Sequence, residues 1–316
     1  MELISTPDAA REYVLHQQVR GNRVSVVPTM GALHDGHLSL IEIAKQRSEI
    51  VLATIFVNPT QFAVGEDLGK YPRTLEQDLE SLRRLGVDAV FVPEADSMYP
   101  SGFSTMVQPP TVAETLEGLF RREHFSGVCT VVLKLFHCIP CDVAVFGRKD
   151  YQQWKVIEAM VRDLNIAVEI VAGDIVRDPD GLAMSSRNRY LDTGQRQQAL
   201  RIPRALDVVC QSYESGIRDA STLEQILKSQ LLLEGDDLGA FRDSLKQSEN
   251  GTGKGRPIVS EPCVAESLSA GVDEVDYAVI VDAESLQPID SVSQTAVALV
   301  ACRVGTTRLI DNRLLG

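Results

Sequence analysis

The 316-residue sequence lacks an apolar run long enough to cross a bilayer. Its longest apolar runs, such as Ile50 to Val57, are far shorter than the roughly 20 residues that a membrane-spanning helix needs. The first residues, Met1 to Asp8, contain no basic residue and no long apolar stretch, so we expect neither a secretory signal nor a transit peptide. These absences predict a soluble, cytoplasmic protein that does not act on membranes.

Basic residues are in deficit. The chain has 31 Lys and Arg against 44 Asp and Glu, which gives a formal net charge of −13. Such a charge disfavours binding to nucleic acid or to an anionic membrane surface. An anionic small-molecule substrate would therefore need a local basic pocket.

The six cysteines provide no second C-x-x-C pair. Cys138 and Cys141 have the spacing of a metal or redox site, with His137 beside them, but a zinc site would need further ligands. We therefore favour small buried residues between a helix and a strand over a metal site. Cysteines scattered through a chain without an export signal fit a reducing compartment.

Several common catalytic and nucleotide-binding motifs are also missing. No G-x-S-x-G, G-x-x-x-x-G-K-[ST] or G-x-G-x-x-G motif organises the chain, and no Ser-His-Asp order stands out. The chemistry of the protein must therefore come from another pattern of residues.

The first 185 or so residues alternate short apolar runs with helical patterns. We expect strands at 23–27, 50–57, 88–92, 142–146 and 167–171, and helices over 38–47, 75–85, 128–139 and from Asp150 onward. The stretch 128–139 is ambiguous, because its β-branched content favours a strand; its length favours the helix that we predict. The alternation predicts an α/β domain over 1–185 with a parallel sheet, whose ligands bind at the carboxyl ends of the strands.

Residues 186–316 are expected to form a second, smaller α+β domain. Helical patterns run over 193–215, with a kink at Pro203, and over 221–233. The polar, glycine-rich stretch 248–257 predicts a flexible loop, and strands are expected at 274–281, 295–302 and 307–311. No dense cluster of chemically active residues lies in this half, so we expect it to close over a substrate as a lid.

The stretch Val26 to His37, with the sequence VVPTMGALHDGH, carries the strongest chemical signal. It follows a predicted strand and opens a helix, so it should present free backbone N–H groups and the positive end of a helix dipole to an anion. Gly31 and Gly36 let the backbone turn tightly. His34 and His37 lie three residues apart, so both rings face one side of the first helical turn and can donate hydrogen bonds to a phosphate. Two polar turn residues without chemistry are the less favoured alternative.

A second group of polar residues follows the strand predicted at 142–146. Within Gly147 to Gln153, Lys149 can pair with a phosphate as a point charge, and Asp150 can accept a ribose hydroxyl. Gln153 lies one helical turn further and can present its amide inward. An exposed Lys–Asp helix cap is a common alternative for this motif when it is taken alone.

Two further stretches offer polar groups without a run of charge. Met184 to Arg187 supplies two hydroxyl donors and a guanidinium at the presumed domain junction, which suits a closing loop that gathers triphosphate oxygens. A polar linker is the alternative. Asn58 and Gln61 can bind a small polar substrate, or they can serve turn chemistry around Pro59.

Two weaker candidates carry charge. The stretch Tyr71 to Asp78 contains carboxylates that can hold Mg²⁺ through water, although a solvated helix face is the commoner explanation. Arg121, Arg122 and His124 form a small basic group that can meet a carboxylate or simply belong to the surface.

The H-x-G-H motif with a later Met-Ser-Ser-Arg resembles the adenylate-forming and nucleotidyl-transferring superfamily that includes class I aminoacyl-tRNA synthetases. Five ordered motifs resemble one family more closely, pantoate–β-alanine ligase (pantothenate synthetase). They are residues 28–37 (PTMGALHDGH), 56–62 (FVNPTQF), 71–73 (YPR), 149–153 (KDYQQ) and 180–191 (DGLAMSSRNRYL). The match runs from about Met1 to Leu191 and continues weakly beyond. It implies a Rossmann-like ATP domain, a small α/β lid, a homodimer and a requirement for Mg²⁺.

The resemblance also implies a reaction and a set of site residues. The reaction is the ATP-dependent condensation of (R)-pantoate with β-alanine to pantothenate through a pantoyl adenylate, with release of AMP and pyrophosphate. The implied catalytic residues are His37, His34, Lys149 and Arg187. The implied ATP-binding residues are Met30, Gly31, Ala32, Leu33, His34, Asp35, Gly36, His37, Gly147, Arg148, Lys149, Asp150, Val176, Met184, Ser185, Ser186 and Arg187.

The same resemblance places the other substrates. Gln61 and Gln153 would bind pantoate, and Gln61 would also lie near β-alanine. Weaker β-alanine candidates are Asn58, Tyr71 and Arg121, and Asp78 is an expected Mg²⁺ contact.

The chain departs from the family pattern in two places. Arg148 stands where the family commonly has an acidic residue, and residues 233–268 form a longer stretch than in compact members. Two other functions remain as alternatives, a nucleotidylyltransferase with a phosphorylated acceptor and a catalytically idle nucleotide-binding protein. The uncharged side chains of Gln61 and Gln153 favour a polyol such as pantoate over the first, and the intact histidine pair disfavours the second.

Overall fold

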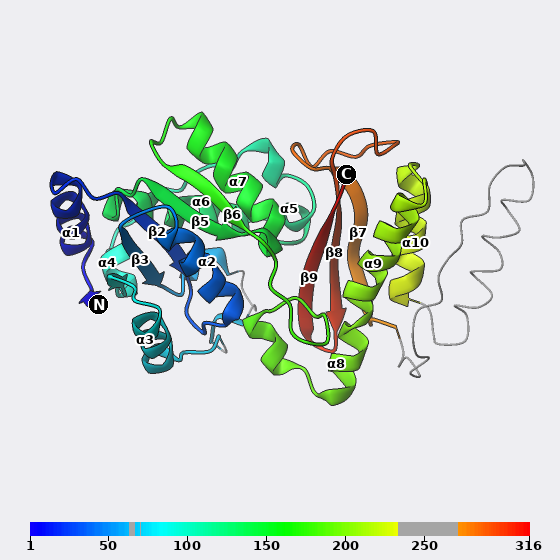
Figure 1. Cartoon of the computed structure of the whole chain (residues 1–316), viewed down its shortest axis with the longest axis horizontal. Helices are drawn as coiled ribbons and strands as arrows, with labels where there is room; N and C mark the ends of the chain where they lie inside the picture. Colours follow the sequence, from blue (N-terminus) through cyan, green and yellow to red (C-terminus); the bar gives the residue numbers. More distant parts are fainter. Residues whose placement is uncertain (63–66, 70, 233–270) are drawn as a thin grey trace, which may run out of the picture. The chain divides into compact units, whose positions relative to one another are not determined.

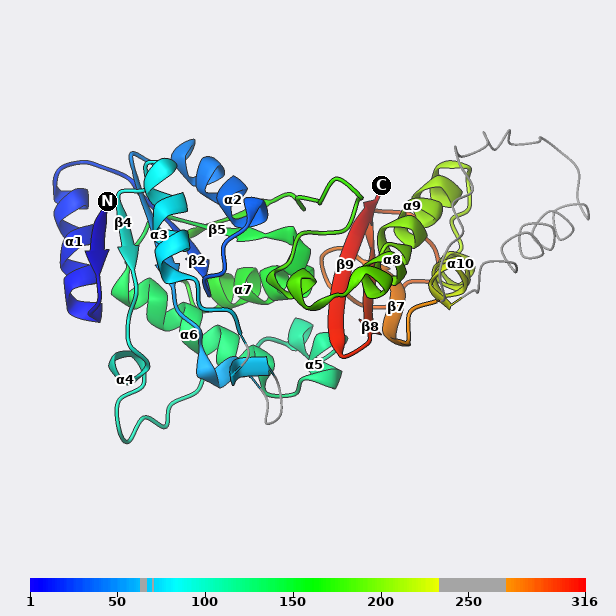
Figure 2. The ribbon, with the colours of Figure 1, turned by 90° about the horizontal axis from the view of Figure 1, so that it is seen from below.

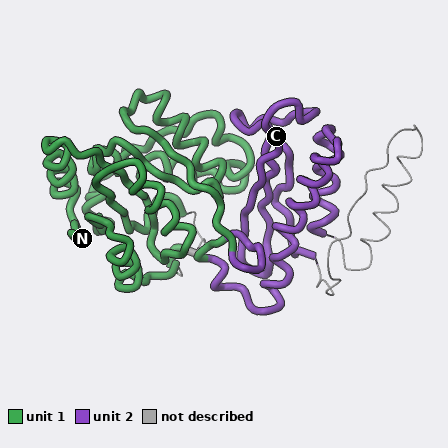
Figure 3. The backbone as a smooth tube through the Cα atoms, in the orientation of Figure 1, with its two compact units in different colours: residues 1–177, 184–186 green, residues 178–183, 187–316 purple. Residues whose placement is uncertain are grey.

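The computed structural model describes residues 1–62, 67–69, 71–232 and 271–316 of the chain. These residues form two compact units, the first made of 1–177 and 184–186 and the second of 178–183 and 187–316 (Figure 3). The loop predicted at 248–257 and the long stretch at 233–268 lie outside the described residues.

The first unit contains a parallel six-stranded sheet and its covering helices (Figure 1). Its elements in chain order are β1 (Glu2–Ile4), α1 (Pro7–Val19), β2 (Val24–Thr29), α2 (Asp35–Lys45), β3 (Ile50–Ile55), the 3₁₀ helices η1 (Pro59–Gln61) and η2 (Asp67–Gly69), α3 (Leu75–Arg84), β4 (Ala89–Phe91), α4 (Ala95–Met98), η3 (Thr111–Ala113), α5 (Glu117–Phe120), α6 (His124–Cys138), β5 (Val143–Gly147), η4 (Arg148–Asp150), α7 (Tyr151–Asp163) and β6 (Glu169–Gly173). The five predicted strands and the helix predicted at 128–139 are confirmed.

The order of the strands creates a topological switch point at β2. The sheet runs β1-β4-β3-β2-β5-β6, and every neighbouring pair is parallel. After β2 the chain adds β3 and β4 on one side, whereas β5 and β6 lie on the other side. Open sheets of this kind bind ligands where the carboxyl ends of such strands diverge. The turns after β2 and β5 are therefore the first places to look for a site.

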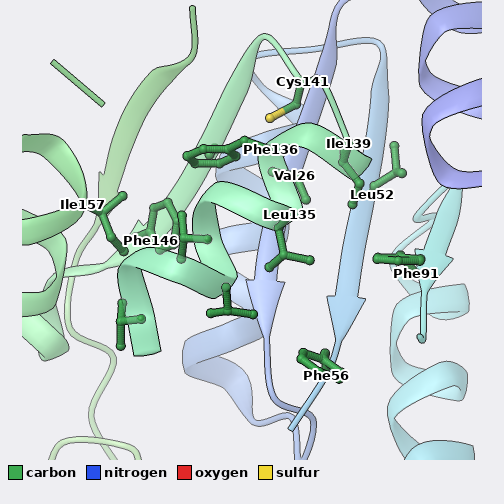
Figure 4. Packing of buried hydrophobic residues seen from close by; sticks show 14 of the residues in the cluster. Val26, Leu52, Phe56, Phe91, Leu135, Phe136, Ile139, Cys141, Phe146 and Ile157 are labelled. Carbon is green, nitrogen blue, oxygen red and sulfur yellow. The ribbon is translucent and has the colours of Figure 1, made fainter. Parts of the chain in front are cut away.

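Both faces of this sheet are covered by apolar helices, as its continuously hydrophobic strands require. On one face Val26 and Leu52 pack with residues of α1, α6 and α7, including Leu135 and Ile157 (Figure 4). On the other face Val27 packs with apolar residues of α2 and α3. Figure 2 shows the strands between these two layers of helices. β2 is buried along almost its whole length, as expected for a strand covered on both faces.

The second unit combines helices with an antiparallel sheet of order β7-β8-β9. Its elements are α8 (Thr193–Ala199), α9 (Arg201–Glu214), α10 (Ala220–Leu232), β7 (Glu274–Asp282), β8 (Ala296–Val304) and β9 (Thr307–Leu315), and the 3₁₀ helix η5 (Ser186–Tyr190) precedes them. The predicted three antiparallel strands are confirmed. The single kinked helix predicted over 193–215 is instead two helices that meet at Leu200. Pro203 lies in the first turn of α9, where a missing N–H breaks no helical hydrogen bond.

No helix among the described residues combines the length and the apolarity that a bilayer crossing requires.

Candidate active site

The turn between β2 and α2 brings the two histidines of the H-x-G-H motif together. His34 is the N-cap of α2, and His37 is the third residue of that helix. Their ring centroids lie 4.1 Å apart, with an interplanar angle of 39°. The prediction that both rings face one side of the first helical turn is confirmed. Gly36 makes this possible, because a Cβ at that position would lie 2.9 Å from the His34 ring.

The backbone of this turn is held by a buried carboxylate from α3. Asp78 accepts hydrogen bonds from the Ala32 N–H at 2.9 Å and from the Leu33 N–H at 2.8 Å, and the residue is 3% exposed. The Gly31 N–H donates to the Thr29 hydroxyl at 3.2 Å. The expectation that the turn offers free N–H groups to an anion is therefore wrong for residues 31 to 33. Their donors maintain the left-handed conformations of Gly31 (φ +83°) and Ala32 (φ +51°), of which the second is unfavourable for an L-residue.

His37 is a neutral hydrogen-bond donor at physiological pH. Desolvation, together with electrostatic repulsion from His34 and Lys149, lowers its pKa to about 3, and the carboxylate of Asp150 opposes this shift. Its Nδ1 lies 3.4 Å from the His34 backbone N–H, which can only donate. The ring proton is therefore assigned to Nε2. A neutral Nε2–H buried beside a lysine suits an anionic ligand.

The turn after β5 supplies the charged residues that act on His37. Lys149 and Asp150 are close enough to shift its pKa, and their own side chains lie 3.6 Å apart. Both sit in η4 at the switch point, as the sequence predicted. Arg148 instead pairs with Asp174 at 2.8 Å and lies 5.8 Å from the Trp154 ring. The expected role of Arg148 in binding ATP stays a prediction.

The Met-Ser-Ser-Arg segment is divided between the two units: Met184 to Ser186 belong to the first unit and Arg187 to the second. The Met184 N–H donates to the Val176 carbonyl at 3.0 Å, and the Cβ of Met184 lies 3.8 Å from where a Cβ on Gly36 would be. The Ser186 hydroxyl donates to the Tyr71 hydroxyl at 3.4 Å. Arg187 belongs to the second unit, so its expected role on the triphosphate stays a prediction.

Both the nitrogen and the oxygen of the Gln61 side-chain amide make hydrogen bonds. Its Nε2 donates to the Met30 sulfur at 2.8 Å, and its Oε1 accepts from Asn58 at 3.2 Å. Asn58 is 1% exposed, and its own Oδ1 accepts from the Tyr99 hydroxyl at 2.7 Å. Asn58 therefore orients Gln61 and does not present its own amide outward. The aromatic partner Tyr99 was missed by sequence reasoning, because an isolated tyrosine 41 residues away gives no local signal.

The two glutamines of α7 divide between structure and site. Gln152 is buried and donates to the carbonyls of Val112 and Thr115 at 2.9 and 2.7 Å. Gln153, one position further, is half-buried. Its expected contact with pantoate stays a prediction.

The described residues contain no cluster of three or more His, Cys, Asp or Glu side chains that could hold a metal ion. Asp78, the expected Mg²⁺ contact, already uses both carboxylate oxygens on the β2–α2 turn. Cys138 and Cys141 are free thiols, and burial raises the pKa of Cys141 to about 12. These observations fit the interpretation of the pair as small packing residues.

The parallel sheet, its switch point and the half-buried histidine pair define a nucleotide-binding enzyme of the α/β class. A model of the pantoate–β-alanine ligase family matches residues 2–314, and the chain belongs to this family. It is thus a member of the ligase class of enzymes.

The chain is similar to proteins of this family over its full length. It is 50% identical to the pantothenate synthetase of Rhodopirellula baltica, with 100% of this chain and 99% of the relative covered. Its structure is similar to that of the pantothenate synthetase from Thermus thermophilus, with a TM-score of 0.82, 37% identity and 99% of each chain covered. A third relative is the pantoate–β-alanine ligase from Francisella tularensis, solved in complex with β,γ-ATP and β-alanine; its TM-score is 0.72 at 30% identity, covering 99% of this chain and 97% of that one.

Proposed function

We propose that this chain condenses (R)-pantoate with β-alanine to give pantothenate, through a pantoyl adenylate, with release of AMP and pyrophosphate. The observation that carries the proposal is the neutral, half-buried His37 beside His34 and Lys149 at the switch point of the sheet. Membership in the pantoate–β-alanine ligase family supports the choice of substrates.

In the first half-reaction, a carboxylate oxygen of pantoate attacks the α-phosphorus of ATP, and the bond to the bridging oxygen of pyrophosphate breaks. Negative charge then grows on the α-phosphate oxygens. Hydrogen bonds from His37 and His34 stabilise this charge, and the ammonium of Lys149 balances the departing pyrophosphate. Ser185, Ser186 and Arg187 would complete the set of contacts to the β- and γ-phosphates.

In the second half-reaction, the amine of β-alanine attacks the acyl carbon of the adenylate, forms the amide bond and expels AMP. No covalent enzyme intermediate is needed, so the rate comes from positioning and charge stabilisation. Gln61 and Gln153 would hold the hydroxyl groups of pantoate, and Tyr71 is a weaker candidate near β-alanine.

The nucleotide would lie along the β2–α2 and β5–α7 turns. Residues 30–37 would meet the phosphates, Gly147 and Asp150 the ribose, and Val176 and Met184 the adenine side. Mg²⁺ enters the proposal as an ion carried by the phosphate oxygens and water, which is its usual mode in phosphoryl-group chemistry. No step is assigned to it through Asp78.

We also propose a cytoplasmic homodimer. The five cysteines among the described residues are all free thiols, which is the state expected in a reducing compartment.

The test is the acceptor dependence of pyrophosphate release. The proposal expects release from ATP and Mg²⁺ only when pantoate is added, and conversion of β-alanine to pantothenate when all substrates are present. Release that requires a phosphate ester in place of pantoate would assign the chain to the nucleotidylyltransferases. ATP binding without AMP formation under all of these conditions would reject an enzymatic role.

A further inference from the structure

The short helix η1 that carries Gln61 is held from behind by two side chains from a distant part of the chain. The main-chain oxygen of Gln61 accepts a hydrogen bond from Nη2 of Arg121 at 3.3 Å. The same oxygen lies 3.0 Å from Nδ1 of His124, the first residue of α6. Two donors on one carbonyl oxygen restrict the position and the orientation of that peptide group more than one donor would.

The contact with the Gln61 carbonyl defines which ring nitrogen of His124 donates to it. A carbonyl oxygen can only accept, so Nδ1 of His124 carries the hydrogen that faces Gln61. Nη1 of Arg121 lies 3.3 Å from Nε2 on the other side of the ring. Glu117, 3.9 Å from Arg121, balances the guanidinium charge inside this largely buried group.

The side-chain amide of Gln61 is held by a separate pair of contacts. Asn58 donates to Oε1 of Gln61, and Gln61 donates to the Met30 sulfur, so the amide cannot flip without losing both contacts. Each end of the amide still keeps hydrogen-bonding capacity, because a carboxamide oxygen has two lone pairs and its nitrogen has two hydrogens. The side chain is thus oriented before any ligand arrives.

We propose that Arg121 and His124 form a positioning clamp for Gln61, which presents the Gln61 amide to the hydroxyl groups of the substrate acid in one orientation. The proposal rests on the proposed function only in that Gln61 binds pantoate. It gives Arg121 a different role from the β-alanine contact suggested by the sequence resemblance. Neither clamp residue touches the reacting atoms; both act through Gln61.

The test compares His124→Asn with His124→Gln, whose amide nitrogens replace different ring nitrogens of the histidine. The Nδ2 of an asparagine at position 124 lies close to the position of histidine Nδ1, so it still donates to the Gln61 carbonyl. The Nε2 of a glutamine lies close to the position of histidine Nε2, so the donor to this carbonyl is lost. We expect His124→Gln to raise the KM for pantoate about tenfold, the usual effect of one lost buried hydrogen bond, with the KM for ATP within about twofold of wild type. His124→Asn should stay within about twofold for both substrates.

A second variant guards against misfolding of the first. Arg121→Lys keeps the charge but cannot contact two acceptors in the fixed fork geometry of a guanidinium, so the KM for pantoate should again rise while the KM for β-alanine stays constant. His137→Gln, an exposed residue near the other end of α6, is the matched control. Thermal unfolding of every variant reports any general loss of structure.

Three outcomes overturn the clamp. They are equal pantoate KM values in His124→Asn and His124→Gln, a parallel rise in the KM for ATP, or a selective rise in the KM for β-alanine in Arg121→Lys. Failure of the proposed function is separate, because it would appear as wild-type protein that releases no pyrophosphate with pantoate. If wild type is active and Gln61→Ala binds pantoate normally, the clamp has no target and is rejected.

Discussion

At the residue scale, the chemistry of the site depends most on the desolvation of His37 and on the charges around it. A neutral imidazole with its proton on Nε2 can donate a hydrogen bond at neutral pH without being charged. It therefore offers fixed electrostatic stabilisation to a phosphate and is unsuited to acting as a general acid. Burial also makes that hydrogen bond stronger than it would be in water.

The first prediction concerns turnover. His37→Ala should lower kcat by about 10²–10³-fold, the usual cost of removing one electrostatic donor from a transition state. Thermal unfolding should show an intact fold, and His16→Ala, at an exposed position of α1, is the control. A variant with near-normal kcat would remove His37 from the mechanism.

The second prediction concerns pH. The pKa of His37 is about 3 in the folded protein and about 6.5 in an unfolded chain, so the unfolded state binds more protons between these values. The free energy of unfolding should fall as the pH drops below about 6.5, by up to about 1.4 kcal/mol per pH unit from this residue alone. Denaturant unfolding of wild type and His37→Gln at pH 7 and pH 5 measures the difference. Equal losses in the two proteins would show that the histidine is charged in the fold.

The third prediction concerns the carboxylate behind the turn. Asp78→Asn keeps one acceptor but sets an amide donor against the second backbone N–H, so unfolding should become easier by about 1–3 kcal/mol. We expect kcat to fall as well, because the turn carries both histidines, while the Mg²⁺ concentration for half-maximal activity is unchanged. A large shift in that Mg²⁺ concentration would instead make Asp78 a metal contact.

The sequence could predict the local part of this site and not the distant part. The spacing of His34 and His37 places both rings on one side of a helical turn whatever surrounds them. Asp78 lies 46 and 45 residues from the two N–H groups whose hydrogen bonds it accepts, so only the packing of α3 against the sheet reveals it. The orientation of Gln61 depends on partners from equally remote segments.

At the scale of elements, the approach of α6 to η1 decides where Gln61 stands. Gly127 permits this approach, because a Cβ there would lie 2.2 Å from the Thr60 carbonyl oxygen and 2.7 Å from the Gln61 nitrogen. Both obstacles are backbone atoms, which cannot rotate out of the way.

The fourth prediction tests that close approach. Gly127→Ala should destabilise the protein and raise the KM for pantoate, although Gly→Ala within a helix normally stabilises by about 1 kcal/mol. The matched control is Gly173→Ala, where the added Cβ would meet the flexible end of Leu40 at a similar 2.2 Å. Measurement of unfolding temperature and pantoate KM separates the two. Equal effects in both variants would mean that η1 simply moves aside.

Element boundaries were predictable where the pattern was local. The buried strands of the parallel sheet are continuous apolar runs, and 128–139 is helical because β5 immediately after it fills the strand position. The division of residues 193–215 into α8 and α9 was missed, since Pro203 can equally kink one helix or begin another. Whether this stretch forms one kinked helix or two helices depends on packing within the second unit.

At the scale of the whole molecule, the junction between the units is interleaved. Residues 178–183 belong to the second unit, 184–186 return to the first, and the chain leaves again at Arg187. The domain boundary predicted at 185 is therefore close to one of several points at which the chain passes from one unit to the other. The segment 178–183 is fastened within the second unit by Arg196, which pairs with Asp178 at 2.7 Å and Asp180 at 2.8 Å.

The central claim is that the site activates a carboxylic acid as an adenylate before any amine is present. The most direct measurement mixes enzyme, ATP, Mg²⁺ and pantoate without β-alanine, quenches the reaction and analyses the enzyme-bound material by mass spectrometry. The account predicts pantoyl adenylate, formed together with pyrophosphate and converted to pantothenate and AMP when β-alanine is added. Pyrophosphate release that requires β-alanine from the start, with no adenylate at any time, would contradict it.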